Sequence, residues 1–442
     1  MKIRSLHIEG CRLIDHVDPN SLSFGSPQRT WTMFVGTNGS GKSTILQVIA
    51  LLAAGAADVD ELVKLPAMFV DERNARPVRL AAEFELSDGR ILSSRLTIHP
   101  GKRNVEGDSW MGTLDAAPDV PENALGKLRE NEMGGQDRLD ALVVGLGVTR
   151  RIPLPEPTPD SPVSRCLGSL FGAASHATNL IDRLEVDEID RDDDGSAPES
   201  KRASHQLADD LDDVLARKHQ LLPRVSSVMK TGRGGIVEAA QLSEGRRIYF
   251  KPGSEGQDIR IPARWLSQGY QSVFTIAADV LGNAYVEAGR PVHPDEITNL
   301  ILIDELDLHV HPQWQTTLVD QLGKVFSNAQ FIATTHAPLL LSGLGRDEIY
   351  LLRQDPLNGT VSVAQSEIDP SLGTGTELLR DFYGIDEAYP NALGAEYEEY
   401  GVLASDPTRT SQEDARASEL RAKLKAEGIE VPFEPVPLEA TE

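Results

Sequence analysis

Hydrophobic positions along the chain occur in short alternating or continuous segments that predict a sheet covered by helices. Residues 3–8 alternate between apolar and polar side chains, whereas residues 30–35 and 299–303 are apolar almost throughout. Alternation is typical of a half-buried strand, and a continuous apolar run is typical of a strand buried on both faces. Helices are predicted at 43–54, 268–288 and 312–326, and a further strand is predicted at 329–334. Strands followed by helices in this order predict a parallel α/β sheet.

Two hairpins and one atypical stretch complete the predicted organisation. Residues 78–86 and 90–98 flank the turn signal Asp88-Gly89, and 246–250 with 258–261 predict a second hairpin. Between about 100 and 245 the chain is rich in Pro, Gly and acidic residues, with helices predicted near 122–132, 164–184 and 204–229. We interpret this stretch as an insertion into the core. The predicted segments are therefore 1–100 and 246–365 (core), 101–245 (a helical, acidic, lid-like insertion) and 366–442 (a helical tail with a loose end at 432–437).

Composition and charge narrow the class of protein. The 442 residues include 43 Lys and Arg against 68 Asp and Glu, a net charge of −25, which argues against a protein that coats nucleic acid with its whole surface. We interpret the acidic runs at 182–194 and 209–213 as solvated faces. Two cysteines provide no disulfide framework. The first residues lack the apolar core of a secretory signal, and no window of about 18 apolar residues predicts a membrane span, so we expect a cytoplasmic protein.

The segment GTNGSGKST follows an apolar strand and precedes a helix. Glycines let the backbone wrap phosphate oxygens, and the helix N-terminus adds positive potential. Lys42 is expected to reach the β- and γ-phosphates, Ser43 to bind Mg²⁺ and Thr44 to contact a neighbouring phosphate oxygen. The predicted nucleotide-binding residues are Gly36, Asn38, Gly39, Ser40, Gly41, Lys42, Ser43 and Thr44.

Three further motifs fit the same chemistry. LILIDE at 300–305 places two acids at the carboxyl end of a buried strand, where Asp304 is expected to hold Mg²⁺ and Glu305 to act as general base. ATTHAP at 333–338 places His336 after the neighbouring strand, within reach of a γ-phosphate. LSQGYQ at 266–271 offers Ser267 and Gly269 at a helix start, which suits a phosphate but is weak evidence alone because serine is a common helix cap.

These four motifs, in this order, resemble the ABC-type ATPase heads, and more closely the soluble group that includes RecF, the overcoming-lysogenisation-defect (OLD) ATPases and the Septu-type defence ATPases, also classed with the AAA family. GTNGSGKST resembles Walker A, LSQGY stands in place of the signature LSGGQ, and LILIDELDLHVHP contains Walker B. The resemblance covers about residues 1–55 and 240–365. It implies a P-loop NTPase fold with a mainly parallel central sheet, an antiparallel portion, a helical insertion and a helical tail.

The resemblance also implies an assembly. It predicts a head-to-tail homodimer in which each ATP lies between the phosphate loop of one subunit and the Ser267/Gly269 helix start of the other. By the same analogy Asp307 and His309 lie at the dimer interface, and Arg12 lies near the adenine or the phosphates. His309 and His311, two positions apart, also suggest a metal site, although we favour interface and helix-start positions for them.

This chain departs from the family pattern in two places. No residue between the phosphate loop and the insertion can be placed as the Q-loop glutamine. The tail lacks the Glu and Asp-x-Asp of a Toprim nuclease, so a built-in nuclease of the OLD type is not expected.

The leading hypothesis is an ATPase, dependent on Mg²⁺, that acts as a conformational switch in DNA repair or anti-phage defence with a separate protein effector. Nucleic acid stays open as a partner, because basic pairs occur at 150–151, 201–202, 230–233 and 246–247, although these could equally be solvated charges. The alternatives are a nucleotide-binding subunit of a membrane transporter and a scaffold that binds ATP without turnover. The insertion, the altered signature and the run ELDLHVHP argue against the transporter, and the presence of Glu305 and His336 argues against the scaffold.

Overall fold

A computed structural model describes the chain as two compact units, Met1–Gly373 and Thr374–Glu442. The residues that it describes are 1–18, 22, 24, 30–55, 59–63, 65–71, 73, 76–101, 113–116, 139–148, 150, 162–172, 239–242, 248–251, 261–262, 268–288, 292–385, 392–429 and 434–436. The predicted helices near 122–132 and 204–229 lie outside them.

The first unit is built on a sheet of eleven described strands in the order β6-β5-β4-β1-β2-β14-β13-β3-β12-β11-β7. Its parallel half contains β13 (Ile349–Gln354), β3 (Trp31–Gly36), β12 (Gln330–Thr335), β11 (Leu300–Ile303) and β7 (Val143–Leu146), each pairing in parallel with the next. Every residue of β3, β12, β11 and β7 is buried. Their continuous apolar runs therefore reflect a sheet covered on both faces.

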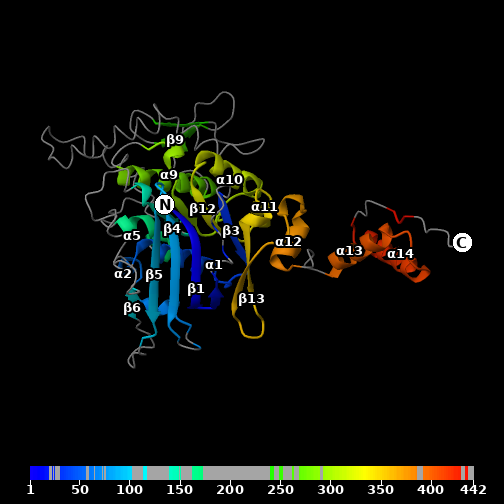
Figure 1. Cartoon of the computed structure of the whole chain (residues 1–442). Helices are drawn as coiled ribbons and strands as arrows, with labels where there is room; N and C mark the ends of the chain where they lie inside the picture. Colours follow the sequence, from blue (N-terminus) through cyan, green and yellow to red (C-terminus); the bar gives the residue numbers. More distant parts are fainter. Residues whose placement is uncertain are drawn as a thin grey trace, which may run out of the picture. The chain divides into compact units, whose positions relative to one another are not determined.

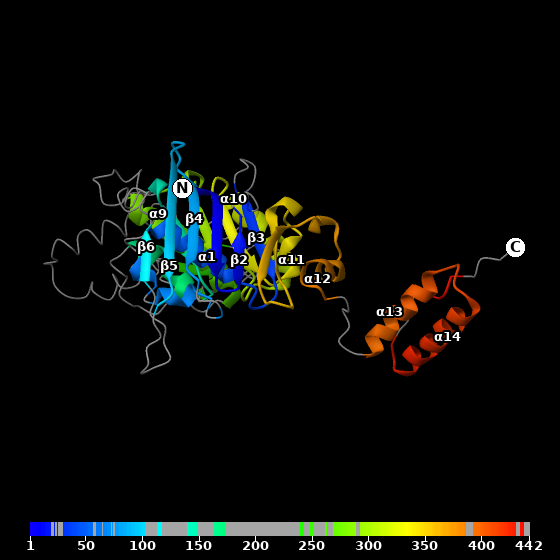
Figure 2. The same ribbon diagram turned by 60° about the horizontal axis from the view of Figure 1, so that its bottom comes forward.

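The other half of the sheet is mainly antiparallel. It contains β1 (Lys2–Cys11), β2 (Ile14–Val17), β4 (Val78–Glu85), β5 (Ile91–His99), β6 (Thr113–Ala116) and β14 (Val361–Gln365). Figures 1 and 2 both show β5, β4 and β1 side by side in cyan to blue. Buried and exposed side chains alternate along β4, as expected for a strand with one solvated face. The Asp88-Gly89 turn is confirmed, with Gly89 at φ 84°.

Helices pack against this sheet. The helix α1 (Lys42–Ala54) follows β3 and is buried along almost its whole length. The other helices of this unit are α2 (Val59–Leu62), α5 (Pro162–Leu167), α9 (Gln268–Ala288), α10 (Pro312–Val325) and α11 (Pro338–Leu341). Short 3-10 turns lie at Pro66–Phe69, Gly168–Phe171, Pro294–Glu296, Arg346–Glu348 and Pro370–Leu372. None of the helices in the described ranges combines the length and the hydrophobicity that a bilayer crossing requires.

A second, three-stranded sheet has the order β10-β9-β8 and contains β8 (Ala239–Leu242), β9 (Ile248–Lys251) and β10 (Ile261–Pro262). Ile261 pairs with Phe250 in an antiparallel register, which confirms the second predicted hairpin. Its third strand, β8, was not predicted.

The second unit contains α12 (Gly375–Tyr383), α13 (Ala392–Ser405) and α14 (Ser411–Ala426). Thr410 caps α14 through a reciprocal hydrogen-bond pair with Glu413, and Tyr400, Leu420 and Leu424 lie in a small buried core between α13 and α14. The prediction of a helical tail is confirmed. The prediction of a loose end is wrong where the structure describes it, because Val436 donates its N–H to the carbonyl of Ala404 at 2.8 Å.

The predicted fold class is confirmed: an α/β P-loop fold with a parallel central portion and an antiparallel flank. The described part of 101–245, however, is not separate from the core. It contributes β6 to one end of the main sheet and β7 to the other, and β7 pairs with β11. Of the helix predicted near 164–184, the structure describes α5 and the following 3-10 turn, up to residue 172.

Candidate functional site

The candidate site lies where three neighbouring parallel strands end. The strands β3, β12 and β11 are adjacent in the sheet and lead into residues 36–44, 335–338 and 304–311 respectively. The carboxyl ends of parallel strands meet at one edge of a sheet, which is where α/β folds bind ligands. This topology brings three of the four sequence motifs together.

The phosphate loop turns sharply between β3 and α1. Gly39 and Gly41 have φ values of 80° and 88°, in the left-handed region that favours glycine. A Cβ on Gly36 would lie 2.6 Å from the carbonyl oxygen of Leu352 on the neighbouring strand β13. Glycine at these three positions therefore lets the loop turn tightly against the sheet.

Donor groups gather inside this loop. The N-cap residue of α1 is Gly41, whose lack of a side chain leaves the first N–H groups of the helix without a side-chain cap. The hydroxyl of Ser40 is buried and has no hydrogen-bond partner within the described part of the chain. An uncapped helix N-terminus beside a buried hydroxyl suits an anion.

Lys42 lies within the same loop. Its Nζ donates to the carbonyl oxygens of Gly36 at 2.8 Å and Thr37 at 2.9 Å. Burial lowers the pKa of Lys42 to about 8, and the negative charges of Asp304 and Glu305 oppose this shift. A partly desolvated ammonium next to an anion-binding loop interacts more strongly with a phosphate than one in bulk water.

Asp304 joins the three strand ends. Its Oδ1 accepts hydrogen bonds from the hydroxyl of Ser43 at 3.0 Å and from Thr334 at 2.6 Å. The residue is only 7% exposed. The two predicted metal ligands, Ser43 and Asp304, are thus in direct contact, and Thr334 orients the carboxylate.

Glu305 adopts an unusual backbone conformation. Its φ is 49°, which a non-glycine residue rarely adopts. Its N–H donates to Thr334 Oγ1 at 2.7 Å, and the next residue, Leu306, donates to the Thr334 carbonyl at 2.8 Å. Such strained positions are often found at functional sites.

Asp307 anchors the loop that carries His336. Its Oδ1 accepts from Thr335 Oγ1 at 2.6 Å and from the N–H of His336 at 3.1 Å. Burial lowers the pKa of His336, and the positive charge of Lys42 lowers it further, while Asp307 opposes the shift. Burial and Lys42 thus favour the neutral form of His336. The resemblance predicted Asp307 at a dimer interface, and the contact seen within this chain is the one with residues 335 and 336.

Arg12 lies beside the phosphate loop, as its predicted role requires. Its guanidinium donates to Thr44 Oγ1 at 2.8 Å and to Gln47 Oε1 at 3.3 Å, and it lies 4.6 Å from the ring centroid of Phe69. Burial lowers the pKa of Arg12. Its φ of 50° places the residue in a tight turn between β1 and β2.

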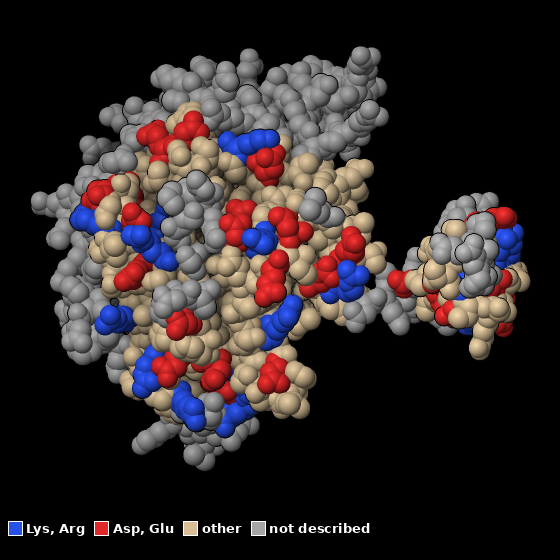
Figure 3. Space-filling model, turned by 45° about the vertical axis from the view of Figure 1, so that its right-hand side comes forward, with Lys and Arg blue, Asp and Glu red and all other residues tan. Residues whose placement is uncertain are grey.

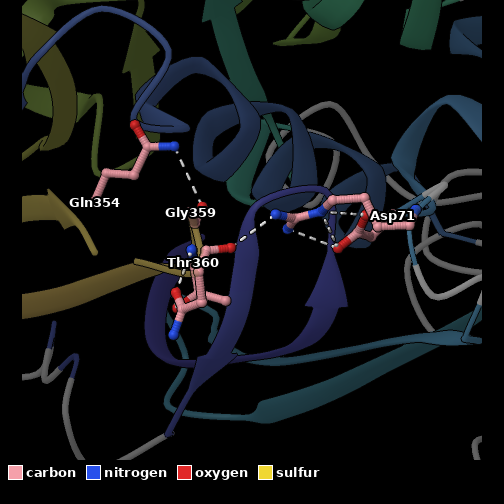
Figure 4. A network of polar contacts seen from close by, with 6 residues as sticks. Asp71, Gln354, Gly359 and Thr360 are labelled. Carbon is pink, nitrogen blue, oxygen red and sulfur yellow. Dashed lines mark hydrogen bonds and ion pairs between the residues drawn. The ribbon is translucent and has the colours of Figure 1, made fainter. Parts of the chain in front are cut away.

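A cavity of about 230 Å³ opens next to Arg12. Figure 4 shows a polar network beside it, in which Asp71 and Thr360 belong to the cavity lining. Arg73 forms an ion pair with Asp71 at 2.9 Å and donates to the carbonyl of Asn358, also at 2.9 Å. Gln354 donates to the carbonyl of Gly359 at 3.3 Å. The lining residues are Gly10, Arg12, Leu13, Asp15, Asp71, Arg73, Asn358 and Thr360.

The signature motif is described only in part. Ser267 lies outside the described residues, and α9 begins at Gln268. Gly269 is buried, and a Cβ there would lie 2.5 Å from the carbonyl oxygen of His309. The signature helix and the loop after Walker B are therefore packed backbone to backbone within one chain.

The histidines after Walker B occupy two different positions. His311 is the N-cap of α10 and accepts from the N–H of Gln313 at 3.3 Å, whereas His309 is exposed with φ 65°. No group of three or more His, Cys, Asp or Glu suited to a metal ion occurs in the described ranges. The helix-start position expected for His311 is confirmed.

One residue of the site was missed by sequence reasoning. Arg150 was grouped with Arg151 as a candidate nucleic-acid patch, but its side chain is buried, with 1% exposure, and donates to the carbonyl of Asp304 at 2.5 Å. The available signal was the apolar run at 141–146 before it, which forms the buried strand β7. The other basic pairs lie outside the described residues. On the face shown in Figure 3, basic and acidic side chains are interspersed.

Comparisons with known families agree with this geometry. A model described as "AAA ATPase domain" matches residues 1–218. A second model, "AAA domain, putative AbiEii toxin, Type IV TA system", matches residues 167–342. Together they include all four motifs.

Curated proteins and solved structures add three likenesses. Septu protein PtuA of Bacillus mycoides (strain KBAB4) is 25% identical over 90% of this chain and 47% of its own length. The Retron Ec83 probable ATPase of Escherichia coli is 39% identical over 22% of this chain and 18% of its own length. This chain thus spans less than half the length of both relatives. The Smc head domain from Pyrococcus furiosus aligns with 84% of this chain, and the alignment includes 97% of its own chain. The sequence identity is 15% and the TM-score is 0.45.

Proposed function

We propose that this chain, two stretches of which match AAA ATPase family models, is an AAA/ABC-type ATPase that binds ATP with Mg²⁺ at residues 36–44 and acts as a switch driven by ATP hydrolysis. The observation that carries the proposal is the hydrogen bond between Ser43 and Asp304, which joins the phosphate loop to the acidic strand end. Phosphoryl transfer depends on positioning and electrostatic stabilisation. The phosphate loop supplies a buried lysine and an uncapped helix N-terminus, and the end of β11 supplies two acids. Together these groups can position the phosphates and stabilise their charge.

The residues present fit a magnesium ion. Hydroxyl and carboxylate oxygens are ligands that Mg²⁺ prefers, and Ser43 Oγ and Asp304 Oδ1 are 3.0 Å apart. When bound, the ion would neutralise negative charge on the phosphate oxygens. Thr334 would hold the Asp304 carboxylate in place through its 2.6 Å hydrogen bond.

We assign the remaining roles as follows. Glu305 accepts a proton from the attacking water as general base. Lys42 binds the β- and γ-phosphates, and His336 contacts the γ-phosphate. Arg12, which touches both Thr44 and the 230 Å³ cavity, lies where it can contact the base or the phosphates.

Hydrolysis in this proposal takes place in a head-to-tail homodimer. The helix start with Ser267 and Gly269 would complete the site of the partner subunit. Because Gly269 packs on the His309 carbonyl, a change at the loop after Walker B would reach the surface offered to that subunit.

For the biological role, we propose anti-phage defence or DNA repair with a separate protein effector. The support is the likeness to Septu protein PtuA and to the retron ATPase. The transporter alternative would be favoured by copurification with a membrane protein.

The test is steady-state ATP hydrolysis by the whole chain with Mg²⁺, with and without duplex DNA, for wild type and Glu305→Gln. Loss of a general base costs about 10²- to 10⁴-fold in rate, so we expect the variant to bind ATP, to dimerise with it and to hydrolyse poorly. The matched control is Glu419→Gln, at an exposed position of α14. Near-wild-type turnover by Glu305→Gln would refute the general-base assignment. Stimulation by DNA would make nucleic acid the trigger, and its absence would favour a protein partner.

A further inference from the structure

Arg150 makes an unusual set of contacts for a buried arginine. It lies shortly after β7, on the side of β11 opposite β12, so it reaches the acidic pair from the other side. Its Nη1 donates to the carbonyl of Asp304 at 2.5 Å, and its Nη2 donates to the carbonyl of Glu305. Its Nε donates to Ser272 Oγ at 3.1 Å. The guanidinium therefore bridges the Walker B backbone and the signature helix α9.

Burying the charged guanidinium of Arg150 costs free energy unless its surroundings compensate for the lost hydration. Burial lowers the pKa of Arg150 to about 10, and the nearby charges of Asp304, Asp307 and Glu305 oppose the shift. The side chain stays charged at pH 7, yet its hydrogen bonds go to backbone carbonyls and one hydroxyl. A rigid planar fork of donors fixes the positions of the groups that it contacts.

The carbonyls of Asp304 and Glu305 belong to the two peptide units that flank the Cα atom of Glu305. These peptide units determine how Glu305 is oriented. That residue has a φ of 49°, which needs support from its surroundings. Thr334 provides support through the N–H of Glu305, and Arg150 provides it through the carbonyl. The backbone of Glu305 is thus held on both sides.

Ser272 extends this support to the signature helix. It is fully buried in α9, three residues after Gly269, which itself packs on the His309 carbonyl. The start of α9 is therefore linked to this region at two separate points. Arg150 connects Ser272 to the carbonyls of Asp304 and Glu305, and Gly269 packs directly on the carbonyl of His309.

We infer that Arg150 is a positioning residue that aligns Glu305 for hydrolysis and couples that alignment to the signature helix through Ser272. This inference rests on the proposed ATPase function. Arg150 contacts the backbone carbonyls of Asp304 and Glu305, so its effect on hydrolysis would pass through these peptide units. Removing it should reduce the rate of the chemical step far more than the affinity for ATP.

The first experiment compares wild type with Arg150→Met and Arg150→Lys in the full chain. Steady-state hydrolysis gives kcat and KM, and a fluorescent ATP analogue gives binding without hydrolysis. Misplacement of a reacting group by about 1 Å costs about 100-fold, so we expect kcat of Arg150→Met to fall by about that factor with binding unchanged. Lysine can donate to one carbonyl and should restore part of the rate. The control is Arg165→Met, a largely buried arginine paired with Glu287 at the other end of α9.

The coupling needs a second experiment, a double-mutant cycle with Ser272→Ala. If Ser272 acts through Arg150, the double variant is no slower than Arg150→Met alone. If instead the fold-losses in rate of Arg150→Met and Ser272→Ala multiply in the double variant, the two residues act independently and the coupling is overturned. If Arg150→Met does not fold, the cycle is run with Arg150→Lys.

The outcomes separate this inference from the proposed function. Unchanged kcat in Arg150→Met, or a loss of binding as large as the loss of rate, overturns the positioning role while wild-type hydrolysis still supports the ATPase. If wild type binds no ATP analogue, the proposed function fails and this inference falls with it.

Discussion

The hydroxyl of Ser43 donates to Oδ1 of Asp304 at 3.0 Å, although 261 positions separate the two residues in the chain. Ser43 is in the first turn of α1, and Asp304 follows β11, two strands away from β3 in the sheet. This contact brings together the two proposed magnesium ligands, which come from two separate motifs. It exists because β3, β12 and β11 run in parallel and end at the same edge.

We expect Asp304→Asn to raise the Mg²⁺ concentration needed for half-maximal hydrolysis and to lower kcat by roughly 100-fold, as removal of one well-placed electrostatic group does. The amide keeps an acceptor for Ser43 and Thr334 but loses the charge that attracts the cation. A titration of ATPase rate against Mg²⁺ concentration measures both effects. Asp320→Asn, at an exposed position of α10, is the control. An unchanged Mg²⁺ requirement would remove Asp304 from the metal site.

The lowered pKa of His336 predicts a pH dependence of stability. The unfolded chain titrates this residue near its ordinary pKa of about 6.5, whereas the folded chain titrates it lower. Between these two values the unfolded state binds more protons, so the free energy of unfolding rises with pH and the full contribution is present above about 6.5. Melting curves at pH 5.5 and 7.5 should show a larger rise for wild type than for His336→Gln. Equal rises would mean that His336 titrates alike in both states.

The sequence predicts the buried strands and the phosphate loop well because their signals are local. Helix 268–288 agrees with α9 at both ends, and the apolar run before Asp304 identifies β11. Arg150 could not be assigned in this way. Its neighbour Arg151 suggested a charged surface, and only the pairing of β7 with β11 brings the guanidinium to the Walker B carbonyls. Long-range pairing of this kind leaves no periodic trace in one sequence.

The steric environment of Gly36 predicts a cost for even a methyl group. A Cβ would lie 2.6 Å from the Leu352 carbonyl oxygen and 2.7 Å from Ser40 Oγ, and the backbone of a central strand cannot move away easily. Gly36→Ala should lower the free energy of unfolding by about 1–3 kcal/mol, as overpacking does in a dense core. Gly375→Ala is the control, because a Cβ there meets nothing within 4 Å. Denaturant titrations of both variants make the comparison, and equal stabilities would show that β3 and β13 can separate locally.

The end of the chain offers a test of how the second unit is held together. Arg409 is largely buried and donates to the carbonyls of Asp406 at 2.9 Å and Val436 at 2.7 Å, while pairing with Asp414. Arg409→Met removes the hydrogen bonds to these carbonyls, and each such bond contributes about 0.5–1.5 kcal/mol to stability.

We therefore expect Arg409→Met to release the segment around Val436, whose N–H is held by Ala404. Amide hydrogen exchange at Val436 should become faster, and the melting temperature of the second unit should fall. Arg416→Met is the control, because Arg416 pairs with Glu399 on the exposed surface, where such pairs contribute about 0–1 kcal/mol. If both variants exchange at the wild-type rate, residues 434–436 are held by other contacts and Arg409 is not what fixes them.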